Sequence, residues 1–335
     1  MAAGAFVISL DFELFWGMRD KRTLADYGGH IRGVRAALPR MLEAFERHGV
    51  KATFATVGLL YHAEREALLK SLPTITPTYR NAGLSPYNGH FDTIGTNEQQ
   101  DLHHFGAGLI RLILEHPQHE LACHTFSHYY CLEEGQTAEQ FKADLRAAER
   151  AAGLFGVKRR SLVFPRNQFN AAYLNICREE GIIAYRGNET SWLYTARNAA
   201  QESLFRRAMR LLDTWLPLSG ANVHPMPDGH ELPVNVPASR FLRPFDPRTA
   251  LLEPLKLRRI TRAMDHATAT GSLFHLWWHP HNFGVHLDEN MRLLEQILAH
   301  FAHLRNRDEM RSMTMGEVAA EAIAQGGHAD RIRMP

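Results

Sequence analysis

Short apolar runs alternate with longer amphipathic segments along most of the chain. Residues 5–10 (AFVISL) and 50–57 (VKATFATV) are rich in β-branched and aromatic side chains, which is typical of buried strands. Between them, residues 34–48 carry apolar side chains at helical spacing and stop at Gly49. A strand–helix–strand order with a crossover of this length predicts parallel strands joined by a right-handed connection.

The same alternation continues toward the C-terminus with shorter elements. Further strands are predicted at 120–123, 161–164, 182–186 and 272–277, and further helices at 102–116, 141–154, 171–180, 255–266 and 290–303. Strands and helices that alternate in this way indicate an α/β fold with a parallel sheet or barrel.

Two segments interrupt this pattern. Residues 72–97 hold three prolines and three glycines, and residues 217–254 hold eight of the 16 prolines. Prolines at this density exclude regular helix, and a structureless loop of that length is unusual in a compact domain. We therefore expect one domain over residues 1–335 with insertions at about 72–100 and 217–254, the second of which forms a wall of a binding site.

Charge and composition narrow the function classes. The chain has 38 Lys and Arg against 36 Asp and Glu, a net charge of +2, so nucleic acid is not an expected partner. The three cysteines fit neither a disulfide framework nor a structural zinc site. The first apolar run lacks a preceding basic region, and no run is long enough to span a membrane. We expect a cytoplasmic protein, either free or at the inner membrane face.

Polar clusters follow several predicted strands directly, at the edge where parallel α/β proteins place their sites. Asp11 and Glu13 come first. In an extended backbone residues i and i+2 point to the same side, so both carboxylates can enter one pocket, where burial and like charge shift the pKa of one toward that of a base. The alternative is a pair of solvated acids at a strand end.

His124 and His128 follow residues 120–123. On a helical turn, this HxxxH spacing places both imidazoles on one face, as a divalent metal ion requires. A chance pairing is the alternative in a chain with 20 histidines. Arg166 and two amides follow residues 161–164, where they either orient a carboxylate or oxyanion or form an exposed polar turn.

The last predicted strand ends at a further histidine. Period-2 alternation puts His275, Trp277 and His279 on one face of this strand. His279, at the strand end, is placed to act as a general acid, whereas His275 lies deeper and is expected to be a hydrogen-bonded core residue.

These clusters (DFE, HTFSH, FPRN and LWWH) resemble, in chain order, the motifs of the polysaccharide deacetylase family, also called the NodB-homology family or carbohydrate esterase family 4. The resemblance covers roughly residues 5–190 and 270–320 and implies a distorted (β/α)7 barrel with long loop insertions. It implies that Asp11 is the general base, His279 the general acid and Arg166 the motif arginine, and that the metal ligands are Glu13, His124 and His128. The family's aspartate that orients the catalytic histidine has no clean counterpart here, and Asp213 is a candidate.

The resemblance also implies an activity. We expect a carbohydrate N-deacetylase, a metal-dependent hydrolase that removes an acetyl or formyl group from an amino sugar with a divalent ion, zinc before cobalt or nickel. An enzyme inside the cell would act on a nucleotide-linked or lipid-linked precursor, as in O-antigen or capsule biosynthesis. Two alternatives stay open: a metal-independent amidohydrolase of the same fold that opens a small cyclic amide, and a carbohydrate-binding protein without catalysis. Sugar rings could stack on Trp192, Trp215, Trp277 or Trp278.

Overall fold

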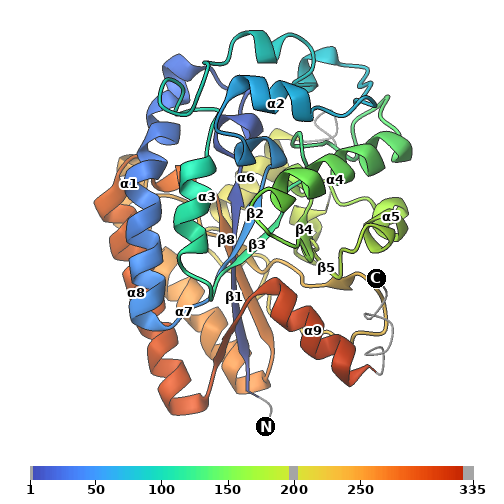
Figure 1. Cartoon of the computed structure of the whole chain (residues 1–335). Coiled ribbons are helices and arrows are strands. Elements are labelled where there is room, and N and C mark those ends of the chain that lie inside the picture. The colour runs from blue at the N-terminus through green and yellow to red at the C-terminus, as the bar shows by residue number, and fades with distance from the viewer. Residues whose placement is uncertain (1–2, 196–202, 327–335) are drawn as a thin grey trace.

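The computed structural model describes residues 3–195 and 203–326. Their strands form one parallel sheet, which curls so that the helices cover its outer side (Figure 1). The central strand is β1 (Ala5–Phe12), which pairs along one edge with β8 (Leu273–Trp278). Along its other edge, β9 (Arg311–Met313) pairs with its first residues and β2 (Thr53–Thr56) with its last.

The remaining strands extend the sheet in the order β6-β5-β4-β3-β2-β1-β8-β7. They are β3 (Glu120–Cys123), β4 (Ser161–Val163), β5 (Ala184–Arg186), β6 (Val234–Asn235) and β7 (Arg240–Phe241). The helices are α1 (Leu24–His48), α2 (Arg65–Ser71), α3 (Ala107–Leu114), α4 (Ala138–Gly153), α5 (Leu174–Glu179), α6 (Leu204–Leu212), α7 (Glu253–Thr270), α8 (Leu287–Asp308) and α9 (Met315–Gln325). Within the described ranges, no helix is both long and apolar enough to cross a bilayer.

The proline-rich segment, residues 217–254, contains β6 and β7. These two strands pair with β5 and β8 at the two edges of the sheet. The backbone N–H groups of Val236 and Ala238 donate to carbonyls of the β5 segment, at 2.8 and 2.9 Å. A few residues later, those of Ser239 and Leu242 donate to carbonyls of β8, both at 2.8 Å. One continuous stretch of chain therefore closes the sheet into a barrel, which is more than the site wall expected from the sequence.

Side chains on β1 alternate between two cores. Phe6, Ile8, Leu10 and Phe12 belong to the large cluster that contains the surrounding helices. Their neighbours Ala5 and Val7 belong to a second cluster of mostly small residues, one or two from each of several strands, together with α9. This second cluster is the barrel interior, and α9 covers its lower end (Figure 1). Farther up β1, the same inward positions carry Ser9 and Asp11, so the interior becomes polar toward the strand ends.

The predicted parallel α/β barrel is confirmed, with differences at several element ends. Helix α1 begins at Leu24, ten residues before its predicted start, because Thr23 and Asp26 form a capping box. Helix α3 begins only at Ala107, because the Asp101 carboxylate accepts hydrogen bonds from the two backbone N–H groups of residues 103 and 104, which shapes a turn there. Helices α2, α6 and α9 and strands β6, β7 and β9 were not predicted.

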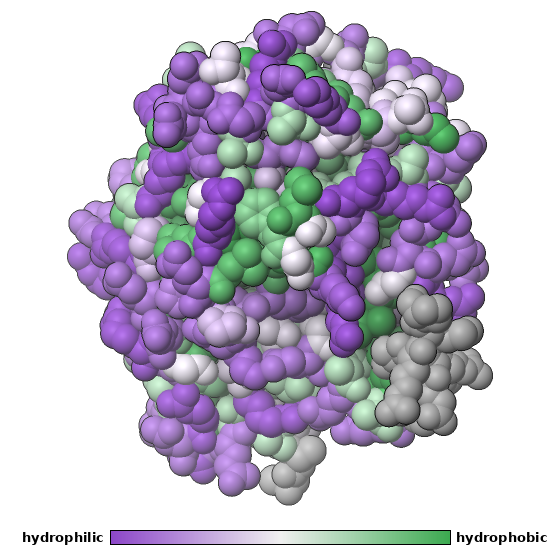
Figure 2. Space-filling view, in the orientation of Figure 1, coloured by the Kyte–Doolittle hydropathy of each residue, from purple (hydrophilic) through white to green (hydrophobic). Residues whose placement is uncertain are grey.

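Most of the molecular surface seen in Figure 2 is hydrophilic, with apolar side chains gathered near α3 in the middle of that face. The inside of the barrel also contains polar groups. His275 is fully buried, and its Nδ1 donates to the Val236 carbonyl at 3.1 Å. Its Nε2 therefore accepts from the Ser9 hydroxyl at 2.8 Å, and the Ser9 oxygen accepts from Arg186 at 2.9 Å. This chain of bonds requires a neutral imidazole, as expected for a core histidine.

Burial and the nearby Arg186 lower the pKa of His275 to about 3. The unfolded chain takes up a proton near pH 6.5 and the folded chain does not, so stability is complete above that pH and falls as the pH decreases. We expect His275→Asn to reduce the slope of unfolding free energy against pH by about 1.4 kcal/mol per pH unit between pH 6 and 4. Urea unfolding measures this slope. The exposed control His266→Asn should keep the wild-type slope, and equal slopes for both variants would contradict the assignment.

Candidate active site and metal centre

A buried ion pair inside the barrel holds the first predicted acid. The Arg186 guanidinium, at the end of β5, donates to both carboxylate oxygens of Asp11, at 2.7 and 2.8 Å. It also donates to the side-chain oxygen of Asn167 at 2.8 Å and lies over the Trp277 ring, 4.3 Å from its centroid. Burial alone would raise the pKa of Asp11, but Arg186, with His124 and His279, outweighs burial and lowers it. Asp11 is therefore a carboxylate at neutral pH.

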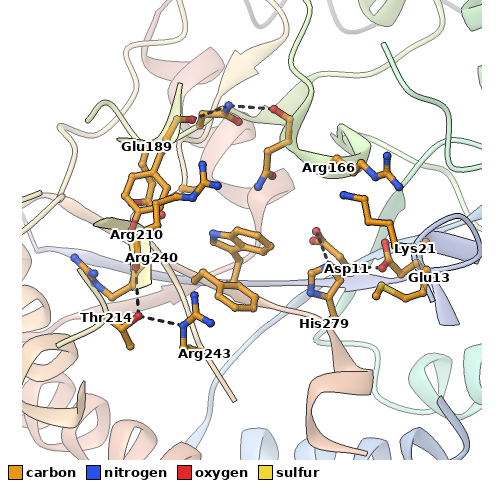
Figure 3. Close-up of a pocket in the computed structure, with 18 of the residues that line it drawn as sticks. Asp11, Glu13, Lys21, Arg166, Glu189, Arg210, Thr214, Arg240, Arg243 and His279 are labelled. Carbon is orange, nitrogen blue, oxygen red and sulfur yellow. Dashed lines mark hydrogen bonds and ion pairs between the residues drawn. The ribbon is translucent and has the colours of Figure 1, made fainter. Parts of the chain in front are cut away.

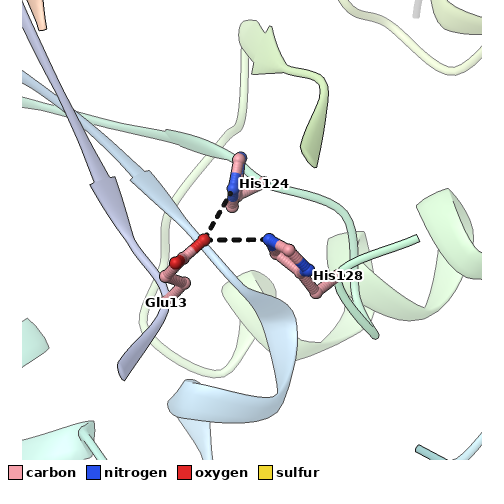
Figure 4. Close-up of side chains that lie close together, drawn as sticks. All are labelled: Glu13, His124 and His128. Atoms are coloured by element: carbon pink, nitrogen blue, oxygen red, sulfur yellow. Dashed lines mark ion pairs between the residues drawn. The ribbon is translucent and has the colours of Figure 1, made fainter. Parts of the chain in front are cut away.

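Two residues farther on, Glu13 meets the two histidines of the HxxxH motif (Figure 4). One oxygen of Glu13, Oε2, lies 2.8 Å from His128 Nε2 and 3.3 Å from His124 Nε2. All three side chains are buried. Burial opposes the charge on Glu13, but His279 and His128 outweigh it and hold the pKa of Glu13 well below its usual value.

The prediction that His124 and His128 lie on a helical turn is wrong. Residues 124–128 form a loop in which Thr125 and His128 have left-handed backbone, with φ of 60° and 58°. The buried carboxylate of Asp144 on α4 fixes this loop. It accepts from the backbone N–H groups of Phe126 and Ser127, at 2.6 and 3.2 Å, and from the Ser127 hydroxyl at 2.5 Å. The strained backbone marks the position as functional.

The donor atoms fit a divalent metal ion. His124 Nδ1 donates to the Val163 carbonyl at 2.9 Å, which leaves Nε2 as the lone-pair nitrogen, and His128 Nδ1 lies 3.2 Å from the Tyr130 hydroxyl. Both Nε2 atoms are buried and face the Glu13 carboxylate, and within the described ranges neither makes a hydrogen bond of good geometry. Around a tetrahedral ion with bonds of about 2.1 Å, ligand atoms lie about 3.4 Å apart, close to the spacing observed here. One carboxylate and two imidazoles together offer the donor set that a divalent metal ion requires.

His279 lies at the end of β8, beside both acids. Its Nε2 is 3.8 Å from Asp11 Oδ2 and 3.6 Å from Glu13 Oε1. The side chain that contacts its other nitrogen is Asn282, whose Oδ1 lies 3.3 Å from Nδ1. Asp213 was the candidate for orienting His279. It is bound to arginines instead, among them Arg259 at 2.8 Å, so this prediction does not hold.

The arginine that contacts Asp11 is Arg186, which the sequence analysis did not name. Arg166 lies in the same cavity, but it pairs with Asp20 and lies over the Tyr130 ring, 4.1 Å from the centroid. Arg166 has left-handed backbone, with φ of 55°, and its side chain points toward Asp20. Arg186 ends a predicted strand, so the strand-end argument applied to the other motifs could have found it.

These residues open into one cavity of about 440 Å³ (Figure 3). Asp11, Glu13 and His279 line one end of it, and Trp277 forms part of its wall. The other candidate tryptophans lie elsewhere: Trp278 is buried in the helix-side core, and Trp192 is 58% exposed. Trp215 is partly buried and does not line the cavity.

Comparison with known proteins was made by sequence and by structure. The sequence model of the polysaccharide deacetylase family matches residues 26–185. Over these residues the chain is similar to polysaccharide deacetylases. No curated protein matches its sequence. A structure from Mycobacterium smegmatis assigned as a polysaccharide deacetylase has a TM-score of 0.61 at 16% identity, over 96% of this chain and 90% of that one.

Two further structures share the fold of this chain. One from Pseudomonas aeruginosa PAO1, also assigned as a polysaccharide deacetylase, has a TM-score of 0.56 at 13% identity, over 96% of this chain and 91% of that one. The allantoinase PuuE has a TM-score of 0.55 at 11% identity, over 96% and 90%. At these identities the likeness establishes the barrel and leaves the substrate open.

The position of the Glu13 carboxylate depends on a glycine. A Cβ on Gly17 would lie 2.0 to 2.3 Å from the Glu13 carboxyl group, so Gly17→Ala must displace that carboxylate while the rest of the fold can stay in place. We expect metal affinity to fall about tenfold or more, since a misplaced ligand weakens such sites. Mass spectrometry of untagged protein should find about one divalent ion per chain in the wild type and much less in Gly17→Ala and His124→Ala.

The matched control is Gly29→Ala on α1, where an added Cβ meets no atom within 4 Å. It should keep the wild-type metal content. Full metal content in Gly17→Ala, with an unchanged melting temperature, would show that Glu13 does not hold the ion.

Proposed function

We propose that this protein is a metal-dependent carbohydrate N-deacetylase that removes an acetyl or formyl group from an amino sugar. The observation that carries the proposal is the convergence of two buried carboxylates and three histidines. Asp11, Glu13, His128 and His279 line one end of a single cavity, and His124 contacts Glu13 there. Amide hydrolysis needs an activated water, stabilisation of an oxyanion and a proton for the leaving nitrogen. This arrangement offers a group for each.

Glu13, His124 and His128 would hold the divalent ion, with zinc favoured over cobalt and nickel for a mixed nitrogen and oxygen donor set. When bound, the ion lowers the pKa of a water molecule and polarises the amide carbonyl. The neutral state of His128 suits this role, since burial lowers its pKa to about 4. The loop fixed by Asp144 sets the distance between the two imidazoles.

Asp11 takes a proton from the attacking water, whose oxygen forms a bond to the acyl carbon. Arg186 keeps this carboxylate ionised and oriented with both of its oxygens bonded. His279 then gives its proton to the sugar nitrogen as the carbon–nitrogen bond breaks, because an amide anion is too basic to leave. Asn282 directs His279 Nε2 toward the reacting groups by contacting Nδ1. The products are acetate or formate and a free amino sugar.

For the substrate, we propose a nucleotide-linked or lipid-linked precursor of a surface polysaccharide such as an O-antigen or capsule. Trp277, whose ring lines the cavity 5.8 Å from that of His279, supplies a face on which a sugar ring can stack. Such an enzyme would act in the cytoplasm or at the inner membrane face.

The test is release of acetate or formate from N-acetylated and N-formylated amino sugars by metal-loaded enzyme. We expect Asp11→Asn and His279→Ala each to reduce kcat about a hundredfold or more, as for loss of a general base or acid. The exposed controls Asp92→Asn and His266→Ala should retain wild-type kcat. Unchanged turnover in Asp11→Asn or His279→Ala would contradict these roles.

The same assay separates the two alternatives. Hydrolysis of small cyclic amides by protein without metal would establish the metal-independent amidohydrolase. Sugar binding without acid release from any substrate would establish the binding protein. Either result would overturn the proposed deacetylase.

A further inference from the structure

The cavity extends well beyond the residues that the proposed reaction uses. At the end away from Asp11 and Glu13 it is lined by Arg210 on α6, Arg240 on β7 and Arg243 just after β7 (Figure 3). Thr214 lies with them, and its hydroxyl oxygen accepts from Arg243 Nε at 3.1 Å. Three guanidinium groups thus face one end of a cavity whose other end carries the acids. We call these three residues the arginine end.

Among the described residues, two acids lie close to Arg240. Asp213 is fully buried and is shared between Arg240, at 3.4 Å, and Arg259, at 2.8 Å. Glu189 also lines the cavity, but burial raises its pKa to about 8, so it is mostly protonated at neutral pH. Arg240 is 5% exposed, and two of its nitrogens, Nε and Nη2, are buried without a hydrogen-bond partner in the described ranges. Buried guanidinium nitrogens that lack an acceptor favour the binding of an anionic ligand.

An aromatic pair joins the two ends. Trp277 and Phe241 have ring centroids 4.7 Å apart, and the Phe241 ring is 6.0 Å from that of His279. Phe241 directly follows Arg240 in β7, so it borders the arginine end as well. A sugar stacked on this pair would present its acylated nitrogen to His279 and another substituent to the arginines.

We infer that the arginine end binds a phosphoryl group attached to the amino-sugar substrate. This inference rests on the proposed function and adds to it the residues that recognise the phosphate of such a substrate. Several guanidinium forks suit a phosphoryl group, because its oxygens are spread tetrahedrally and can accept from donors on more than one side. Both nucleotide-linked and lipid-linked sugars carry a phosphoryl group. The arginine end would recognise this shared group in either substrate.

The test compares kcat/KM for acid release from an N-acyl amino sugar with that from its 1-phosphate, its nucleoside diphosphate and its polyprenyl phosphate. We expect the phosphorylated forms to be better substrates, and Arg243→Ala to lower the ratio of phosphorylated to neutral kcat/KM about tenfold or more, since charge-assisted contacts are strong. Arg243→Lys should recover part of the ratio. The matched control Arg248→Ala, at an exposed arginine five residues away with 87% side-chain exposure, should leave the ratio unchanged.

The possible outcomes distinguish a failure of the phosphoryl site from a failure of the proposed deacetylase activity. Acid release at equal rates from neutral and phosphorylated sugars, with a ratio insensitive to Arg243→Ala, would overturn the phosphoryl site and leave the deacetylase intact. No release from any N-acyl sugar would overturn the proposed function itself. Preference for the polyprenyl over the nucleotide form, or the reverse, identifies the source of the phosphate.

A second observation concerns the other side of the helix that carries Arg210. Helix α6 is strongly amphipathic, but its polar side faces the protein. Arg206 is 4% exposed and donates to the carbonyls of residues 192 and 193, at 2.8 and 2.9 Å, and Arg210 lines the cavity. Its apolar side faces outward: the exposed fractions are 79% for Leu204, 65% for Phe205 and 45% for Leu212. This is the reverse of a normal surface helix.

Further apolar side chains close to the helix in the chain, or bonded to it through their backbone, are also exposed. Leu216 and Leu218 are 49% and 45% exposed, and Trp192, whose carbonyl Arg206 holds, is 58% exposed. Arg207 is exposed on the helix itself. Apolar side chains outward with a basic residue beside them are the composition of helices that lie in the interface of an anionic bilayer. Exposed apolar surface of this extent marks a contact site.

We propose that the outer side of α6 docks on an anionic lipid bilayer. The same helix gives Arg210 to the arginine end, so a phosphate at the bilayer surface would lie close to the cavity. The test is co-sedimentation of the full chain with vesicles of equal parts phosphatidylglycerol and phosphatidylethanolamine. We expect binding, and we expect the double variant Phe205→Ser/Leu212→Ser to reduce it about tenfold or more, because each buried apolar side chain contributes strongly.

Both substituted side chains are exposed, so the double variant should keep its melting temperature. The control Leu154→Ser alters an equally exposed leucine, 68% exposed, at the end of α4 and should bind vesicles as the wild type does. Absence of vesicle binding by the wild type would overturn the proposal. A dimer in sedimentation that the double variant abolishes, without vesicle binding, would assign the surface to a second copy of the chain.

Discussion

The ion pair between Asp11 and Arg186 is the contact around which the site is built. Arg186 comes from β5 and Asp11 from β1, strands that are separated by three others in the sheet, and the two side chains meet inside the barrel. Removing either partner would leave a buried charge uncompensated, which typically costs about 3–5 kcal/mol. The same guanidinium also bonds Ser9 and Asn167, so it connects β1, β5 and the loop after β4.

The rest of the site follows from this pair and from the narrow barrel. Buried apolar residues, most of them small, fill the lower interior, whereas the upper interior is polar and opens into the cavity. Buried histidines stay neutral because burial penalises their charged form, as the lowered pKa values of His128 and His275 show. Neutral imidazoles can ligate a metal or accept a hydrogen bond. His128 is placed for the first role, beside Glu13, and His275 for the second, beside Ser9.

The cavity is polarised along its length, with acids and histidines at one end and arginines at the other. Helix α6 contributes to this asymmetry, because Arg206 and Arg210 turn inward and its leucines outward. An orientation of this kind exposes apolar surface, which costs free energy in water unless a partner covers it. The phosphoryl site and the bilayer contact that we propose therefore use opposite sides of one helix.

The sequence by itself determined the alternation of strands and helices, the parallel barrel and the positions of Asp11, Glu13, His124, His128 and His279 at strand ends. These depend on local periodicity and on the rule that parallel strands end at one edge, so neighbouring residues carry the information. Tertiary structure alone decided that Arg186, and not Arg166, binds Asp11, and that Asn282, and not Asp213, contacts His279. It also decided the left-handed loop of the HxxxH motif, which depends on Asp144 16 residues beyond the second histidine. Such partners are chosen by three-dimensional proximity inside a closed barrel, and spacing along the chain does not encode that proximity.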